Sequence, residues 1–263
     1  MSVVEQPWAS LRRYTAARIG LGRVGASVPT AAHLAFQQAH AEARDAVHAP
    51  LDAPALLAGL RALGEAPLQL QSRAADRAVY LQRPDLGRRL RESDADLLQG
   101  LQSTPADLAF VLADGLSALA LQRQALPLFT ALRERLLREG GWTWAPPVVA
   151  TQARVALGDE VGELLQARCV VVLIGERPGL SAPDSLGVYF SWAPRLGLVD
   201  AERNCISNVR PEGLAPAAAA AKLHGLLSLA RTRQLSGVAL KDEDDERALP
   251  TAAGAPLMRL LAG

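Results

Sequence analysis

The chain has 263 residues, 49% of them hydrophobic and 21% charged, a composition typical of a globular protein with a sizeable core. Its 28 basic and 27 acidic residues leave a net charge of +1, which argues against nucleic-acid binding because that function needs a basic excess or patch. The longest aliphatic run, residues 169–174, is far too short to cross a membrane, so no membrane partner is expected.

The N-terminus and the cysteines indicate an intracellular protein. No basic segment precedes an apolar stretch at the N-terminus, so the order of a secretory signal is missing. The two cysteines cannot form a disulfide framework and fit a reducing compartment. No cysteine and histidine cluster has the spacing of a zinc site.

Two regions follow from the patterning: a mainly helical region over residues 1–100 and an α/β domain over residues 101–263. Thr30 is a candidate cap for a first helix over residues 31–48, because a threonine side chain can accept from free backbone N–H groups. The helical prediction therefore begins early in the chain.

A second helix is predicted over residues 53–63, with Asp52 as its cap and Gly64 at its end. Alternating apolar and polar residues then predict a short strand over residues 67–73. Residues 79–90 place three arginines and an aspartate around a proline and a glycine, a composition that suits a contact surface better than a core.

From about residue 105 short apolar runs alternate with helical stretches. Strand candidates are residues 107–117 with their turn, a run within 145–160, and residues 169–175, 187–194 and 204–209. Helix candidates are residues 117–141, which Pro127 must kink or split, residues 158–167 and residues 215–237. Continuously apolar strands that alternate with helices predict a Rossmann-like, mostly parallel sheet with flanking helices on both faces.

Ligands of such sheets bind outside the carboxyl ends of the strands. The most hydrophobic strand candidate, residues 169–175, is followed directly by Glu176 and Arg177. Asp114 and Gly115 end another strand candidate and can face the same crevice. The sequence therefore predicts a ligand site at the ends of these two strands.

The candidate site residues allow several interpretations. Glu176 can serve as a general acid, as an acceptor for a ligand hydroxyl or as an ion-pair partner of Arg177. Cys205 is either a nucleophile or a small packing residue, and no histidine lies near it in the sequence. Cys169 opens the buried strand and is interpreted as structural. The glycine-rich residues 20–25 follow no convincing strand and are interpreted as a turn, not a phosphate loop.

Five segments in chain order resemble one family. They are "LRRYTAARIGLGRVG", "VYLQRPDLGRRL", "VLADGLS", "ARVALGDEVGELLQARCVVVLIGERPGL" and "ERNCISNVRPEG". Together they resemble the small (light) subunit of ethanolamine ammonia-lyase from about residue 8 to about residue 240. The strings "RPDLGRR", "IGERPGL" and "CISN" carry most of this resemblance.

The resemblance implies a lyase that converts ethanolamine to acetaldehyde and ammonia with adenosylcobalamin, whose adenosyl radical abstracts hydrogen from the substrate. In that family the large subunit is a TIM barrel that holds ethanolamine, and the small subunit closes over the cobalamin in a hetero-oligomer. The implied partners are thus the large subunit and adenosylcobalamin. The expected location is the cytoplasm, either free or inside a bacterial microcompartment.

The resemblance also implies the cofactor contacts. The corrin-contacting positions fall on Val155, Glu176 and Cys205, with no catalytic residue and no metal ligand on this chain. A strand-end glutamate can accept from a nucleotide-loop hydroxyl or a corrin amide, and a buried valine or cysteine can pack on the macrocycle. No histidine stands two residues after an aspartate, so we expect the dimethylbenzimidazole of the cofactor to stay on cobalt.

Two other interpretations stay open at this point. The chain is either a stand-alone Rossmann-like enzyme that binds a nucleotide or coenzyme, or a purely structural assembly subunit without a ligand. The first requires catalytic residues that the sequence does not offer. For the lyase subunit, the basic segment with Arg83, Arg88 and Arg89, together with the N-terminal helices, is the expected contact with the large subunit.

Overall fold

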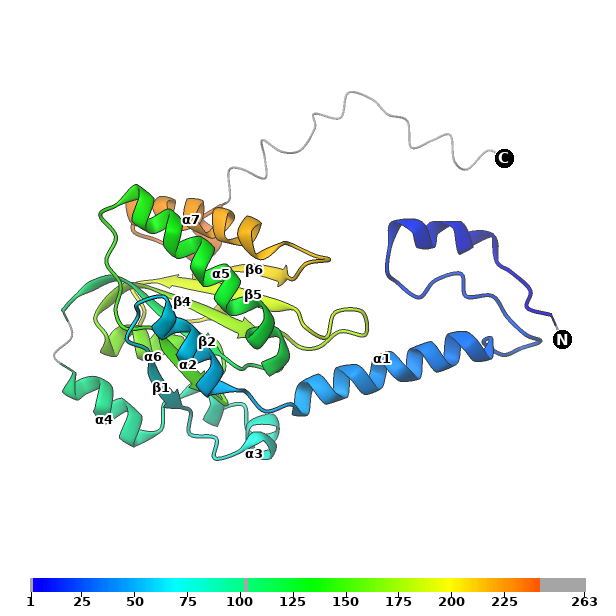
Figure 1. Ribbon diagram of the computed structural model, residues 1–263, viewed down its shortest axis with the longest axis horizontal. Helices are drawn as coiled ribbons and strands as arrows, with labels where there is room; N and C mark the ends of the chain where they lie inside the picture. Colours follow the sequence, from blue (N-terminus) through cyan, green and yellow to red (C-terminus); the bar gives the residue numbers. More distant parts are fainter. Residues whose placement is uncertain (1, 102–103, 242–263) are drawn as a thin grey trace, which may run out of the picture.

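The computed structural model describes residues 2–101 and 104–241, and its centre is a six-stranded sheet (Figure 1). Across the sheet the strands stand in the order β1-β3-β2-β4-β5-β6. Their bounds are β1 Leu68–Gln71, β2 Ala106–Ala113, β3 Val148–Thr151, β4 Ala167–Gly175, β5 Leu186–Trp192 and β6 Arg203–Val209. The longest aliphatic run of the sequence thus forms β4, a strand with neighbours on both sides.

The sheet is mostly parallel, as predicted, but not throughout. Strands β1, β3, β2 and β4 pair in parallel, whereas β5 pairs antiparallel with β4, and β6 antiparallel with β5. The prediction of a mostly parallel sheet is therefore confirmed, and β5 and β6 are its two antiparallel strands. Parallel neighbours need a crossover of a dozen or more residues, usually a helix. Residues 176–185 and 193–202 join the last strands without a helical crossover, so the chain simply reverses.

Both faces of the sheet are buried, which explains the continuous hydrophobicity of its central strands. Because successive side chains of a strand point to opposite faces, β2 contributes to two separate cores. Leu108, Phe110 and Leu112 pack in one core, and Ala109 and Val111 in the other. A strand with this environment cannot show a polar face, and its sequence accordingly does not alternate.

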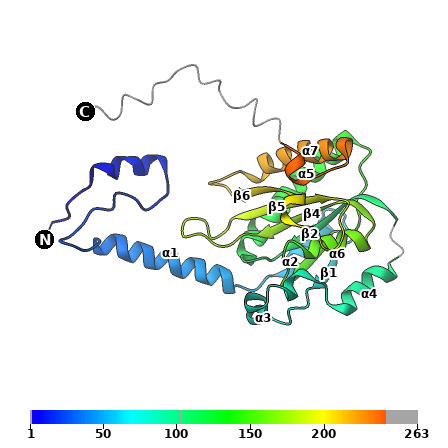
Figure 2. The ribbon, with the colours of Figure 1, turned by 180° about the vertical axis from the view of Figure 1, so that it is seen from behind.

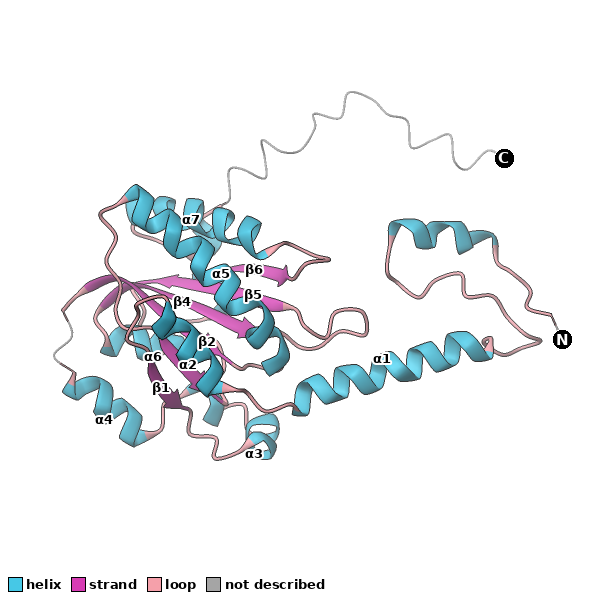
Figure 3. Ribbon diagram, in the orientation of Figure 1, coloured by secondary structure: helices cyan, strands magenta, loops and turns pink. Residues whose placement is uncertain are grey.

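Helices cover the two faces in separate layers (Figure 3). One core receives side chains from α2 (Ala53–Ala62), α5 (Ala118–Glu139) and α7 (Pro216–Arg233). The other receives them from α4 (Glu92–Gly100) and α6 (Leu157–Leu164). Pro127 lies inside α5 and does not split that helix. Flanking helices on both faces were predicted, and the structure confirms them.

Of the two predicted N-terminal helix caps, the structure confirms one and contradicts the other. Asp52 accepts a hydrogen bond from the backbone N of Ala55 at 3.0 Å and caps α2, as predicted. Gly64 has a φ of +85° just beyond that helix, in the left-handed region that glycine enters without strain. The cap prediction for Thr30 is wrong. Thr30 is the first residue of α1 (Thr30–His48), and the preceding Pro29 has no side-chain oxygen to offer.

Residues before 100 are only in part a separate helical region. Strand β1 pairs with β3 in the sheet, and α3 (Arg77–Gln82) packs beside it, so this part of the chain belongs to the α/β body. The sheet therefore begins well before the boundary expected at residue 100. Residues 2–48 are different, and we call them the N-terminal arm.

The N-terminal arm projects from the α/β body in both views (Figures 1 and 2). It consists of the 3₁₀ helix η1 (Pro7–Tyr14), a turn region and α1. No residue of η1 is buried, and in α1 only Ala39 and Ala46 are. One tie to the body is the Arg18 Nη2 group, which donates to the carbonyl oxygen of Leu180 at 3.3 Å. The arm thus leaves its apolar side chains largely uncovered.

Short 3₁₀ helices complete the described chain: η2 (Leu86–Arg88), η3 (Asp200–Glu202) and η4 (Gly237–Ala239). Within the described ranges, every helix falls short of the length and hydrophobicity needed to cross a membrane. Residues 241–263 begin with a charge run, which is typical of a solvated extension. All of them except Lys241 lie outside the described residues.

Candidate functional site

A cavity of about 450 Å³ opens where β2 and β4 end. We call it the strand-end cavity. It brings together two of the predicted site residues, Val155 and Glu176, which lie in different segments of the sequence. Gly115 lines the same cavity, so the expectation that the ends of both strands face one crevice is confirmed. Its lining is Tyr80, Gly115, Leu116, Arg154, Val155, Ile174, Gly175, Glu176, Arg177 and Tyr189.

Two glycines allow the strand ends to meet. A Cβ atom on Gly175 would lie 2.0 Å from the carbonyl oxygen of Ser117, and one on Gly115 would lie 2.2 Å from the carbonyl oxygen of Gly175. Gly115 also has a φ of +57°, in the left-handed region. The backbone N of Leu116 donates to that same Gly175 oxygen at 2.9 Å. The floor of the cavity is therefore backbone that only glycine can supply.

Glu176 is held by hydrogen bonds, not by its neighbour Arg177. Its Oε2 accepts from the Ser185 hydroxyl at 2.5 Å and from the backbone N of Asn208 at 3.3 Å. The described residues place no ion pair between Glu176 and Arg177, so the ion-pair interpretation is wrong. Oε1 receives no hydrogen bond from any described residue. The carboxylate therefore keeps an acceptor for a ligand that enters the cavity.

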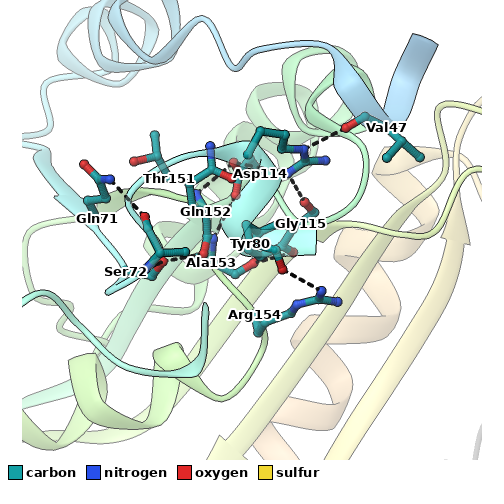
Figure 4. Close-up of polar contacts among 12 residues, drawn as sticks. Val47, Gln71, Ser72, Tyr80, Asp114, Gly115, Thr151, Gln152, Ala153 and Arg154 are labelled. Atoms are coloured by element: carbon teal, nitrogen blue, oxygen red, sulfur yellow. Dashed lines mark hydrogen bonds and ion pairs between the residues drawn. The ribbon is translucent and has the colours of Figure 1, made fainter. Parts of the chain in front are cut away.

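Val155 lines the cavity directly after residues 152–154. Asp114 holds this loop in place (Figure 4). The Asp114 carboxylate accepts from the backbone N of Gln152 at 2.9 Å and from that of Ala153 at 3.0 Å. The hydroxyl of Tyr80 donates to the carbonyl oxygen of Ala153 at 3.1 Å. Burial raises the pKa of the Asp114 carboxyl, and these two N–H groups oppose that shift.

Arg77 connects this loop to the N-terminal arm. Its guanidinium lies 3.7 Å from Asp114 and donates to the carbonyl oxygens of Gly115 at 2.8 Å and Val47 at 2.7 Å. It also stacks on the Tyr80 ring, 4.8 Å from the ring centre, and the Arg154 guanidinium lies 4.3 Å from that centre. Desolvation raises the pKa of the buried Tyr80 hydroxyl well above its usual value, so Tyr80 stays a neutral donor. The loop, the strand end and the base of the arm thus share one polar network.

Comparison with known proteins adds the family. The sequence model described as Ethanolamine ammonia-lyase light chain matches residues 5–241. The chain is 61% identical over 255 residues to an "Ethanolamine ammonia-lyase small subunit" of Azotobacter vinelandii, covering 96% of this chain and 94% of that protein. The chain belongs to the ethanolamine ammonia-lyase light-chain family. Proteins of the same name from Pseudomonas aeruginosa strain LESB58 and Ralstonia nicotianae are 58% and 59% identical over 248 and 244 residues. They cover 93% and 92% of this chain, and 90% of each relative is covered.

The third predicted contact of this light chain, Cys205, lies beside the strand-end cavity but outside its lining. It stands on β6 opposite Tyr189 of β5, whose side chain lines the cavity. Cys205 is exposed, so it is not buried within this chain, and its contact with the macrocycle stays a prediction. Desolvation by the atoms around its thiol raises the thiol pKa, and the negative charge of Glu176 adds to the shift. A thiol with a raised pKa is a poor nucleophile.

The three arginines of the basic segment of the light chain have different environments. Arg83 pairs with Asp85 on the surface at 2.7 Å. Arg89 donates two hydrogen bonds of 3.1 Å to the Glu160 carboxylate, so its side chain is held by a contact within this chain. Arg88 remains exposed. The segment is therefore not one uniform basic surface.

The sequence analysis missed Tyr80, Arg154 and Tyr189 as lining residues. Arg154 adjoins Val155, and Tyr80 stands in a segment that carries the family resemblance, but neither has a local pattern that indicates a cavity. Among the described residues no cluster of three or more histidine, cysteine, aspartate or glutamate side chains can hold a metal ion.

Proposed function

We propose that this small subunit acts with the large subunit in the conversion of ethanolamine to acetaldehyde and ammonia, and that its strand-end cavity contacts part of adenosylcobalamin. The observation that carries the proposal is the shared position of Val155 and Glu176 on one cavity. The family model and the relatives support the reaction class. The mostly parallel sheet fits a ligand at the carboxyl ends of its parallel strands.

The lining suits one part of a corrinoid. Val155, Ile174 and the Tyr189 ring offer apolar surface to a macrocycle, and the free Oε1 of Glu176 accepts from an amide or hydroxyl. A cavity of about 450 Å³ is smaller than a whole corrinoid, so the remainder of the molecule would lie against the partner. When bound, adenosylcobalamin supplies the radical that starts the reaction. This chain binds, orients and shields the cofactor.

The histidines fit a cofactor that keeps its own base on cobalt. His33, His40 and His48 lie on α1, and His224 lies on α7, where it contacts Glu139. None of them lines the strand-end cavity. The same lining offers no nucleophile with an adjacent base, which disfavours the stand-alone enzyme. A cytoplasmic location, free or in a microcompartment, stays a prediction.

Replacing Glu176 by alanine is expected to raise the KM for adenosylcobalamin about 10- to 100-fold, because a hydrogen bond to a charged group contributes roughly 1.5–3 kcal/mol. The kcat for ethanolamine at saturating cofactor is expected to change much less. The measurement combines the visible absorption of the cofactor with ammonia release, using both subunits. The matched control is Glu134→Ala, an exposed carboxylate on α5.

The subunits should release ammonia only together. Turnover by this chain alone would favour the stand-alone enzyme, and a mixture that leaves the cofactor spectrum unchanged would contradict the proposal. An unchanged KM in Glu176→Ala would remove Glu176 from the cofactor site.

The N-terminal arm is the proposed contact with the large subunit. Its apolar side chains have no cover in this chain: Leu34 is 58% exposed and Trp8 60% exposed. Leu34→Glu is therefore expected to weaken co-purification of the two subunits at least tenfold, since it places a charge on a surface that should become buried. Leu137→Glu, at a leucine 55% exposed near the end of α5, is the control and should assemble normally. Equal assembly of both variants would contradict a role of this arm.

A further inference from the structure

The first half of the N-terminal arm, residues 2–28, folds back on itself, and we call it the arm head. Val4 and Arg23 pair in an antiparallel bridge with backbone N to O distances of 2.8 and 3.0 Å. A Cβ atom on Gly20 would lie 2.7 Å from the backbone N of Ala9, and Gly20 has a φ of +57°. The arm head therefore has a defined shape that depends on a close approach at a glycine.

This shape is not held by a core of the arm head itself. None of residues 2–28 is buried, and the ring of Tyr14 is among the exposed ones, with Tyr14 73% exposed. Fixing the backbone of one residue costs roughly 1–2 kcal/mol, and proteins offset that cost mainly by burying apolar surface. The arm head therefore requires a partner surface that covers its apolar side chains.

The arm head also concentrates positive charge. Its charged residues are four arginines and one glutamate: Arg12, Arg13, Arg18, Arg23 and Glu5. The guanidinium groups contact neutral groups: Arg12 donates to the carbonyl oxygen of Ala9 at 3.3 Å, and Arg13 stacks 4.7 Å from the centre of the Tyr14 ring. Within residues 2–101 and 104–241 none of the four forms an ion pair with a carboxylate. The net charge of +1 for the whole chain thus conceals a basic patch on the arm.

A hollow of about 580 Å³ lies between the arm head, α1 and the segment that joins β4 to β5. Arg18 lines it together with the apolar side chains of Leu21, Val28, Phe36 and Leu180. Such a hollow accepts a protruding apolar side chain, and the guanidinium in its wall can pair with a carboxylate beside that side chain. The combination fits a protein surface better than a layer of lipid headgroups.

We infer that the arm head docks on an acidic surface of the large subunit, whose carboxylates pair with the four arginines. The inference rests on the proposed function and deepens it, because it states the chemistry of the partner surface. Guanidinium groups bind carboxylates through two parallel hydrogen bonds and are weakly hydrated, which suits ion pairs that become buried at an interface. Opposite charges across an interface mainly raise the association rate. Assembly of the two subunits is therefore fast at low salt and slows as salt is added.

The test measures the association rate constant of the full chain with the immobilised large subunit, at about 50 mM and about 500 mM NaCl. The double variant Arg12→Glu/Arg13→Glu is expected to associate at least tenfold more slowly at the lower salt, and to approach the unaltered chain at the higher salt, where charges are screened. Arg12→Lys/Arg13→Lys keeps the charge and should keep most of the salt dependence. Thermal unfolding of both variants should match that of the unaltered chain, because neither side chain is buried.

Arg61→Glu/Arg138→Glu is the matched control, since it changes the charge of the chain equally. Arg61 and Arg138 are exposed and lie in the last turns of α2 and α5, outside the arm. This variant should slow association by about twofold at most. Equal slowing of the two Glu variants, or an association rate of the unaltered chain that does not fall with salt, would overturn the acidic docking surface.

Vesicles of phosphatidylcholine and phosphatidylserine test the other partner for a basic and apolar surface. The unaltered chain should not sediment with them. Vesicle binding that is lost in Arg12→Glu/Arg13→Glu, with unchanged association to the large subunit, would assign the arm head to a membrane surface instead. If the unaltered subunits neither associate nor release ammonia together, the proposed function itself fails.

Discussion

Replacing Arg203 by methionine is expected to lower the free energy of unfolding by about 3–5 kcal/mol at pH 8, because it leaves a buried carboxylate without its counter-ion. The side chains of Arg203 and Asp159 are each 3% exposed, and they form a direct hydrogen-bonded ion pair. Arg203 also donates to the carbonyl oxygen of Leu198 at 3.0 Å. Its second carboxylate partner, Asp200, is fully exposed and contributes little.

The stability lost in Arg203→Met is expected to increase with pH. Desolvation raises the pKa of Asp159 to about 6 even with Arg203 in place, whereas the pKa of an unfolded aspartate is about 3.9. Between these values the folded chain binds more protons than the unfolded chain, so the Asp159 contribution to stability falls as pH rises. Without Arg203 the pKa of Asp159 should rise further. The variant should therefore lose less stability at pH 5 than at pH 8.

Urea unfolding at the two pH values measures these differences. The double variant Asp159→Leu/Arg203→Met is the control, and it should recover most of the stability lost in the single variant, since no unpaired charge remains. A single variant as stable as the original chain at pH 8 would show that the pair does not hold β6 to α6. The double variant separates loss of the charge pair from loss of packing.

Replacing Asp114 by alanine is expected to cost about 2–4 kcal/mol of folding stability and to weaken corrinoid binding at least tenfold. The variant leaves the backbone N–H groups of Gln152 and of the buried Ala153 without this acceptor, and it removes the counter-charge of Arg77. The loop would then no longer present Val155 at a fixed position. Thermal unfolding and titration with cyanocobalamin, in the complex with the large subunit, measure the two effects.

Asp107 provides a matched control on the same strand. It lies near the opposite end of β2, where its carboxylate accepts from the backbone N and the hydroxyl of Thr143, both at 3.0 Å. Asp107→Ala should also reduce stability but leave the Kd for cyanocobalamin unchanged, because it is remote from the strand-end cavity. Equal Kd changes in both variants would mean that Asp114 acts through global stability, not by positioning the loop.

Local sequence patterns were sufficient to predict those strands and helix caps that depend only on residues close together in the chain. The aliphatic run at residues 169–175 predicted a buried strand, and it forms the greater part of β4. Asp52 capped a helix as predicted, because a cap needs only an acceptor within a few residues of free N–H groups. Glu176 directly follows that strand. The prediction that it lines a ligand site came from the rule that parallel sheets bind ligands at the carboxyl ends of their strands.

Contacts between distant segments were beyond the reach of these patterns. The antiparallel direction of β5 and β6 depends on how residues 176–185 turn, which hydrophobicity does not encode. Arg89 looked like part of a contact surface, yet it pairs with Glu160, which lies 71 residues away in the chain. The exposure of Cys205 likewise depends on its place on β6, which the residues around it in the sequence do not reveal.

The sequence by itself determined the family, the six strands and the helices α2, α5, α6 and α7. It also singled out four residues of the strand-end cavity: Gly115, Val155, Glu176 and Arg177. Only the tertiary structure decided which side chains complete that cavity and which ones hold its loop in place. The hydroxyl of Tyr80 reaches Ala153 across 73 residues, and Asp114 reaches the same loop across 38 residues. Such contacts form only when the sheet brings the strand ends together, because hydrogen bonds and ion pairs act over a few ångströms whatever the separation along the chain.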